Sequence, residues 1–243
     1  MAKLKKAQAE ETQLKTNMNN SSKVRPDDLY EFNALTKSQQ EAFGAWDDGD
    51  HLVLAGSAGT GKTFIAMYLA LEALLNKQNR FDKVIILRSI VPVREIGYLP
   101  GTLAEKQEVY ETPYKGICEE LFHDNAAYNK LKNNHQLFFE STSFIRGQSF
   151  RNAIVIVDEM QNLNFHELDS VMTRLGDNCR IIFCGDYYQS DFIYENEKDG
   201  VNKFLRIVDR LRAFSVINFK WHDIVRSGLV RDYIMTKEEL GIK

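Results

Sequence analysis

Short apolar runs alternate with longer amphipathic segments along this chain. Six runs have the length and the content of β-branched and aromatic residues typical of buried strands. They cover residues 51–55, 83–88, 137–140, 153–157, 180–184 and 214–219. Segments with the helical spacing of apolar residues occupy 36–46, 64–75, 103–122, 165–175 and 199–211. This alternation predicts an α/β fold with right-handed crossovers and a parallel sheet covered by helices on both faces.

The first apolar run leads into a glycine-rich octet at the start of a helix. The octet reads Gly56-Ser57-Ala58-Gly59-Thr60-Gly61-Lys62-Thr63, which has the spacing of a phosphate-binding loop. Its glycines let the backbone approach a polyphosphate and direct N–H groups at the oxygens. Lys62 would contact the β- and γ-phosphates, Thr63 would offer its hydroxyl to Mg²⁺, and the positive helix end would face the same anion. A tight glycine turn is the alternative, but the strand-loop-helix context favours nucleotide binding.

The run 153–157 ends in two carboxylates, Asp158 and Glu159. We expect Asp158 to hold Mg²⁺ and Glu159 to orient and deprotonate the water that attacks the γ-phosphate of ATP. An apolar run that ends in Asp-Glu is a weak signal alone. A phosphate-binding loop upstream strengthens it, because the phosphates need a metal ion and the metal ion needs an acid.

Three further polar residues are expected near the same edge of the sheet. The Gln39 amide could pair with adenine, or Gln39 is an exposed helix residue. Arg88 ends the run 83–88, where open α/β sheets bind ligands, or it pairs with a neighbouring carboxylate. Gln189 follows the run 180–184 and could sense the γ-phosphate, or it belongs to a turn.

Two loops add candidate contacts. The stretch from Val91 to Glu108 has two Pro and two Gly, which predicts a long irregular excursion that leads into a helix. Tyr98 in this stretch could stack on a nucleic-acid base or simply pack. Arg146 lies in a second loop, after the run 137–140.

Composition and charge limit the class of protein. Hydrophobic residues make up 44% and charged residues 27%, and no apolar run has membrane-spanning length. Cys118, Cys179 and Cys184 lack C-x-x-C spacing, and no apolar signal-type stretch begins the chain, so we expect a soluble cytoplasmic protein with reduced thiols. Residues 1–25 hold six Lys and Arg against two Glu and are expected to form a flexible basic tail. The remainder, 26–243, is acidic, which argues against broad binding of duplex DNA.

Several motifs, in this order, resemble those of the PhoH-like family, whose core is similar to the first RecA-like domain of superfamily 1 helicases. They are GSAGTGKT, IILRSIVPVREIGYLPG, FIRGQSF, VIVDEMQN, MTRLGDN and GDYYQSD. The resemblance extends over roughly residues 35–235. It implies a single RecA-like P-loop NTPase domain with a sheet of order 5-1-4-3-2, ATP binding and hydrolysis, and ring-shaped, often hexameric assembly.

The resemblance also suggests roles for individual residues. Gln39 matches the glutamine that contacts adenine, and Gln161 and Gln189 match the coupling and sensor positions. Arg226, in the segment HDIVRSGLV, is the candidate for an arginine finger. Its competitors are Arg146, Arg174 and Arg231.

One RecA-like domain supplies only part of the site that two such domains form in superfamily 1 helicases. We therefore expect a neighbouring subunit to provide an arginine in trans. The predicted function is ATP hydrolysis coupled to remodelling of RNA or single-stranded DNA, with Arg88, Tyr98 and Arg146 as contacts. The alternative is an ATP-dependent switch or assembly factor that acts on protein partners. A small-molecule kinase is a third interpretation, but the sequence has no recognisable lid or acceptor pocket.

Overall fold

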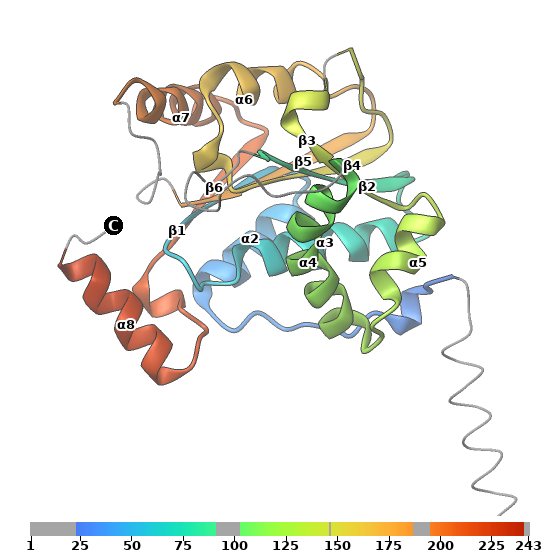
Figure 1. Ribbon diagram of the computed structural model, residues 1–243, viewed down its shortest axis with the longest axis horizontal. Coiled ribbons are helices and arrows are strands. Elements are labelled where there is room, and N and C mark those ends of the chain that lie inside the picture. The colour runs from blue at the N-terminus through green and yellow to red at the C-terminus, as the bar shows by residue number, and fades with distance from the viewer. Residues whose placement is uncertain (1–22, 91–102, 146, 187–194, 241–243) are drawn as a thin grey trace, which may run out of the picture.

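A parallel sheet forms the centre of the molecule (Figure 1). The computed structural model describes residues 23–90, 103–145, 147–186 and 195–240, and within these residues the sheet has six strands. The strands are β1 (His51–Gly56), β2 (Lys83–Arg88), β3 (Leu137–Ser141), β4 (Ala153–Asp158), β5 (Cys179–Gly185) and β6 (Phe214–Phe219). The helices are α2 (Lys37–Asp47), α3 (Lys62–Leu75), α4 (Leu103–Phe122), α5 (Ala127–Asn133), α6 (Phe165–Met172), α7 (Glu195–Val208) and α8 (Gly228–Glu239). Short 3₁₀ turns are η1 (Pro26–Asp28), η2 (Thr142–Phe144), η3 (Met160–Asn162) and η4 (Trp221–Asp223).

The strand order is β3-β2-β4-β5-β1-β6, and every neighbouring pair is parallel. This corrects the predicted order 5-1-4-3-2, which counts five strands. When β3 is left out and the remaining strands are renumbered along the chain, the two orders agree. The physical difference is an additional edge strand, β3, which pairs with β2 and extends the sheet beyond the predicted core.

Helices cover both faces of the sheet, as predicted. Helices α2, α3, α4 and α5 lie on one face, and α6 and α7 lie on the other (Figure 1). Successive residues of each strand point to opposite faces. In β1, for example, Leu52 and Leu54 join the core under α3, whereas Val53 and Ala55 join the core under α6 and α7. The continuous apolar runs follow from burial on both faces.

The helices of the structure differ in part from the predicted ones. The N-cap of α2 is Thr36, whose hydroxyl accepts a hydrogen bond from the Gln39 N–H. Two helices, α5 and α8, were not predicted. The predicted excursion at 91–102 and most of the predicted tail at 1–25 lie outside the described residues.

The three cysteines are free thiols. Cys118 and Cys184 are buried in the core, and Cys179 packs against it. Burial raises the pKa of the Cys118 thiol to about 12. No helix among the described residues is long and apolar enough to cross a membrane.

Candidate functional site

The phosphate-binding loop joins the end of β1 to the start of α3. Gly56, Gly59 and Gly61 have φ values of 129°, 75° and 83°, in the region that side chains disfavour. A Cβ atom on Gly56 would lie 1.9 Å from the carbonyl oxygen of Phe219 on the neighbouring strand β6. Glycine is therefore required at the first position by the sheet itself, in addition to any ligand.

Lys62 is the first residue of α3, and its side chain turns back over the loop. Its Nζ donates hydrogen bonds of 2.7 Å to the carbonyl oxygens of Gly56 and Ser57. Burial lowers the pKa of Lys62, and the nearby carboxylates, Asp186 foremost, act in the opposite direction. The ammonium group thus lies inside the loop, where the predicted phosphates would bind.

The side chains of Thr63 and Asp158 meet, and their binding of a shared metal ion stays a prediction. The Thr63 hydroxyl donates a 2.9 Å hydrogen bond to Oδ1 of Asp158, although the two residues are far apart in sequence. Asp158 is buried, with only 4% of its surface exposed. A hydroxyl and a carboxylate are hard oxygen donors of the kind that Mg²⁺ prefers.

The side chains that could bind a metal ion here suit Mg²⁺ better than a metal ion whose ligands all come from the protein. Among the described residues, no group of three or more His, Cys, Asp and Glu could hold a metal ion. Mg²⁺ does not need such a group, since it is usually bound by one or two carboxylates together with phosphate oxygens and water. The residues present therefore suit a metal that arrives with a nucleotide.

Glu159 follows β4 in a left-handed backbone conformation, with φ of 53°. Gln161 donates a hydrogen bond from Nε2 to the Glu159 carboxylate and accepts a 3.0 Å hydrogen bond at Oε1 from the Asp186 N–H. Gln161 is 6% exposed. The ends of β4 and β5 are thus linked through one buried amide, and the coupling role suggested for Gln161 stays a prediction.

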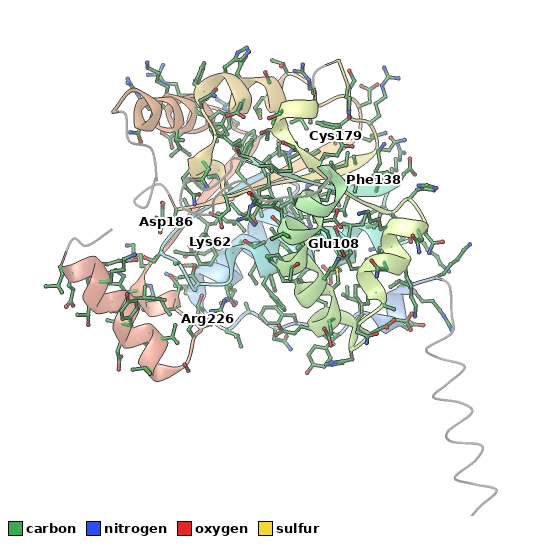
Figure 2. All side chains as sticks on the ribbon, viewed as in Figure 1. Lys62, Glu108, Phe138, Cys179, Asp186 and Arg226 are labelled. Carbon is green, nitrogen blue, oxygen red and sulfur yellow. The ribbon has the colours of Figure 1, made fainter. Side chains whose placement is uncertain are left out.

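These residues gather at one end of the sheet. In Figure 2, Lys62 and Asp186 lie at the same end, whereas Cys179, at the beginning of β5, lies at the other. Parallel strands place their carboxyl ends along one edge, and open α/β sheets bind ligands there. The predicted phosphate loop and the predicted acids therefore share an edge, as expected.

Gln39 is buried beneath the phosphate-binding loop. It is 1% exposed, which excludes the exposed helix position considered from the sequence. Its Oε1 accepts a 2.8 Å hydrogen bond from the Leu35 N–H, and its Nε2 donates a 3.4 Å hydrogen bond to the Thr60 carbonyl. The contact with adenine stays a prediction.

A segment near the C-terminal end of the described chain crosses the phosphate-binding loop. The Val225 N–H donates a 3.1 Å hydrogen bond to the carbonyl of Gly59, and a Cβ atom on Gly59 would lie 3.1 Å from Cγ of Arg226. The Ser57 hydroxyl donates a 3.1 Å hydrogen bond to Glu238 of α8. Sequence reasoning identified Arg226 but missed Glu238, because no motif marks a lone carboxylate on a helix without a buried face.

The competing arginines differ in their surroundings. Arg174 donates a 2.7 Å hydrogen bond from Nε to the Ile145 carbonyl and a 2.8 Å hydrogen bond from Nη1 to the Ser170 carbonyl, so its guanidinium is used within the fold. Arg231 is exposed on α8. Arg146, together with Tyr98 and Gln189, lies outside the described residues.

Arg88 lies at the end of β2, beside a tyrosine that the sequence analysis did not single out. The Tyr114 hydroxyl donates a 2.7 Å hydrogen bond to Oδ2 of Asp158. Burial opposes the positive charge of Arg88, but its neighbours, chiefly Tyr114 and Asp158, outweigh burial and raise the pKa of Arg88. Burial and Asp158 also raise the pKa of the Tyr114 hydroxyl. Arg88 is thus close enough to Asp158 to feel its charge, and both alternatives for Arg88, a ligand contact or a pair with a carboxylate, stay predictions.

The parallel sheet, the loop between β1 and α3, and the acids after β4 define the P-loop NTPase class of folds. Within this class the chain belongs to the PhoH family. The family described as "PhoH-like protein" matches residues 31–237.

Similar proteins from three bacteria agree with this assignment. A PhoH-like protein from Synechocystis sp. is 33% identical over 211 residues, which cover 84% of this chain and 62% of that protein. Protein PhoH from Escherichia coli (strain K12) is 30% identical over 198 residues, or 81% of this chain and 55% of that protein. A PhoH-like protein from Bacillus subtilis is 31% identical over 201 residues, or 82% and 61%. The chain spans about three fifths of the length of these relatives.

Solved structures with a related arrangement have low sequence identity. The Hef helicase domain from Pyrococcus furiosus has 15% identity and a TM-score of 0.43, with 78% of this chain and 39% of that chain covered. The Pif1 helicase from Candida albicans has 15% identity and a TM-score of 0.42, with 86% and 44% covered. We take no residue role from either structure.

Proposed function

We propose that this protein binds ATP with Mg²⁺, hydrolyses it, and couples hydrolysis to remodelling of RNA or another single-stranded nucleic acid. The observation that carries the ATPase part is the 2.9 Å hydrogen bond between Thr63 and Asp158. It joins the helix that follows the phosphate-binding loop to the acid at the end of β4. Membership of the PhoH family supports the same proposal.

In the proposed reaction, the backbone N–H groups of the loop and the Lys62 ammonium would hold the β- and γ-phosphates. Thr63 and Asp158 would hold Mg²⁺, which would neutralise charge on the phosphate oxygens. Glu159 would accept a proton from the attacking water at a carboxylate oxygen. Gln161 would keep that carboxylate in place through the hydrogen bond from its amide.

The backbone at Glu159 supports its assignment as the general base. A non-glycine residue in the left-handed region costs free energy, and such residues concentrate at functional sites. Here the conformation places the carboxylate directly after the buried Asp158 and within reach of Gln161. In a solvent-exposed turn, water would bind the carboxylate, and the hydrogen bond from Gln161 would not be needed.

Two variants test the ATPase proposal. Lys62→Ala should reduce the affinity for ATP at least about tenfold, since it removes the charge facing the phosphates. Glu159→Gln should bind ATP as the unmodified protein does but lower kcat by a factor of about 100 or more. Binding is measured with a fluorescent ATP analogue and turnover by phosphate release. The matched controls are Lys77→Ala and Glu119→Gln, two exposed residues on or beside helices. Full turnover in Glu159→Gln would rule out Glu159 as the base.

The nucleic-acid part of the proposal has a separate test. Single-stranded RNA or DNA should raise kcat or lower the KM for ATP, and the effect should weaken as salt increases, because phosphate contacts release counterions. Turnover that ignores both nucleic acids at low salt would contradict this part. It would leave the ATPase proposal intact.

The second candidate function is an ATP-dependent switch that acts on protein partners. The observation that favours it is α8, whose apolar side chains Leu229, Val230 and Tyr233 are exposed. Exposed apolar groups on one helix often mark a protein contact. ATP hydrolysis that is indifferent to nucleic acid would favour this function. Assembly into a homo-oligomeric ring is part of the same proposal and would use a protein contact of this kind.

A further inference from the structure

Tyr114 is a buried polar group that the proposed reaction does not yet use. It lies in the middle of α4, is 0% exposed, and its ring packs beside Phe139 of β3 with 5.6 Å between ring centroids. Its hydroxyl donates a 2.7 Å hydrogen bond to Oδ2 of Asp158. A buried tyrosine hydroxyl needs a partner, but this partner is the predicted metal-binding acid.

The two oxygens of Asp158 have different partners. Oδ1 accepts the 2.9 Å hydrogen bond from Thr63, and Oδ2 accepts the hydrogen bond from Tyr114. Because both oxygens are held, the carboxylate cannot rotate without losing a bond in a buried environment. Groups that hold a metal-binding carboxylate in this way commonly set its affinity for the metal.

Arg88 lies beside the Tyr114 hydroxyl. Its positive charge acts on that hydroxyl against the effect of burial and of Asp158, which raise the pKa of Tyr114. A guanidinium has only donors, so Arg88 does not compete with Asp158 for the hydroxyl proton. The single proton is therefore available for Asp158, which accepts the hydrogen bond.

We propose that Tyr114 is a positioning residue for Mg²⁺: its hydroxyl holds Oδ2 of Asp158, so that Oδ1, which accepts from Thr63, is the oxygen that would serve the metal ion. This inference rests on the proposed Mg²⁺-dependent nucleotide site. Tyr114 itself does not contact the metal in this arrangement. It acts through the orientation of Asp158, and α4 thereby becomes part of the support of the site.

The test replaces the hydroxyl and keeps the ring, with Tyr114→Phe. The measurement is the affinity for a fluorescent ADP analogue at a series of Mg²⁺ concentrations, compared with the affinity in EDTA. We expect the EDTA affinity to stay within about twofold, since the phosphate loop is untouched. The Mg²⁺ concentration that gives half of the metal-dependent gain should rise about tenfold. The matched control is Tyr128→Phe, which removes another buried hydroxyl, from α5, and should change neither quantity.

A second variant keeps the test decisive if Tyr114→Phe does not fold. Arg88→Ala leaves Tyr114 in place but removes the positive charge beside its hydroxyl and near Asp158, so the half-saturating Mg²⁺ concentration should rise about threefold. An unchanged Mg²⁺ dependence in whichever of the two variants folds overturns the inference. If the unmodified protein binds no nucleotide at any Mg²⁺ concentration, the proposed function itself fails, which is a different result.

Discussion

At the scale of single residues, backbone conformation at Gly56 and Glu159 shapes the candidate site. Gly56 ends β1 with φ of 129° and faces the backbone of Phe219 in the register of β6. Glu159 has φ of 53° immediately after β4. The first conformation costs little because glycine has no Cβ, whereas the second costs free energy at a residue whose carboxylate is bonded to Gln161. Both residues begin the turns that leave the sheet.

Gly56→Ala should therefore destabilise the fold even without a ligand. The added Cβ would lie 1.9 Å from the Phe219 carbonyl oxygen, so the strand pair must move apart or the loop must shift. We expect a loss of about 3 kcal/mol or more in the free energy of unfolding, measured by urea titration. The control is Gly44→Ala in α2, where a Cβ meets nothing within 4 Å and a gain of about 0.5 to 1 kcal/mol is expected. Equal stability of the two variants would contradict this account.

The sequence was sufficient for some residues of the site and insufficient for others. Lys62 and Thr63 follow from the spacing of the loop, and Asp158 follows from the apolar run before it, because a strand fixes where its last residue lies. Tyr114 and Glu238 could not be found in this way. Their contacts with Asp158 and Ser57 depend on how α4 and α8 cross the sheet edge, and side-chain spacing within a helix does not encode that.

At the scale of elements, Arg180 joins the start of β5 to the end of α2 and the turn that follows it. Its Nη2 donates hydrogen bonds of 2.7 Å to the Trp46 carbonyl and 2.6 Å to the Asp50 carbonyl. Its guanidinium lies 3.2 Å from the centre of the Trp46 ring. Burial lowers the pKa of Arg180 to about 10, so the group stays charged at neutral pH. One side chain thus ties the helix before the phosphate loop to the sheet.

Arg180→Ala should loosen this junction. Two carbonyl groups lose a charged donor and the Trp46 ring loses its cation, so we expect a loss of about 2 to 4 kcal/mol in the free energy of unfolding. Arg180→Lys keeps the positive charge but loses the planar guanidinium that stacks and donates. Its free energy of unfolding should lie between those of Arg180→Ala and the unmodified protein. Arg210→Ala, an exposed arginine after α7, is the control and should change stability by less than about 0.5 kcal/mol. If thermal or urea unfolding gave equal stability for Arg180→Ala and Arg210→Ala, the role of Arg180 at this junction would be refuted.

Elements with two buried faces were the easiest to predict, and elements without a buried face were missed. The strands β2 and β4 coincide with continuous apolar runs because helices cover both sides of the sheet. In α8 no residue is buried, so its sequence has no apolar face dictated by the core. The short helix α5 buries three residues, Ala127, Tyr128 and Leu131, too few to establish a helical period.

At the scale of the whole molecule, α8 lies apart from the layered core and next to the phosphate-binding loop. Figure 1 shows it beside the sheet edge, away from the two helical layers. Leu229 is 82% exposed, yet Glu238 on the same helix contacts Ser57, and a Cβ on Gly59 would lie 3.2 Å from Ile234. The segment before α8 also places the stem of Arg226 against Gly59 of the same chain. A partner that bound the exposed side of α8 would therefore also affect the phosphate-binding loop.

This placement changes the expectation for Arg226. The sequence led us to expect an arginine supplied to a neighbouring subunit, but Arg226 packs on its own loop, and the Val225 N–H holds the segment there. We now expect Arg226 to act within its own chain. To test this, Arg226→Ala subunits are mixed with Glu159→Gln subunits over a range of ratios, and ATP turnover is measured. Light scattering with and without ATP gives the oligomeric mass.

Each inactive subunit in such a mixture has one defect. If Arg226 served a neighbour, an Arg226→Ala subunit would keep its own Glu159 and could borrow an intact arginine from a Glu159→Gln subunit, so turnover would return and peak near equal amounts. If Arg226 serves its own site, no pairing restores both groups, and turnover should stay at the level of the separate variants at every ratio. Lys62→Ala mixed with Glu159→Gln gives the baseline, because the contacts of both residues lie within one chain. Recovery above that baseline would return Arg226 to the shared-site arrangement and would require α8 or its loop to move when subunits assemble.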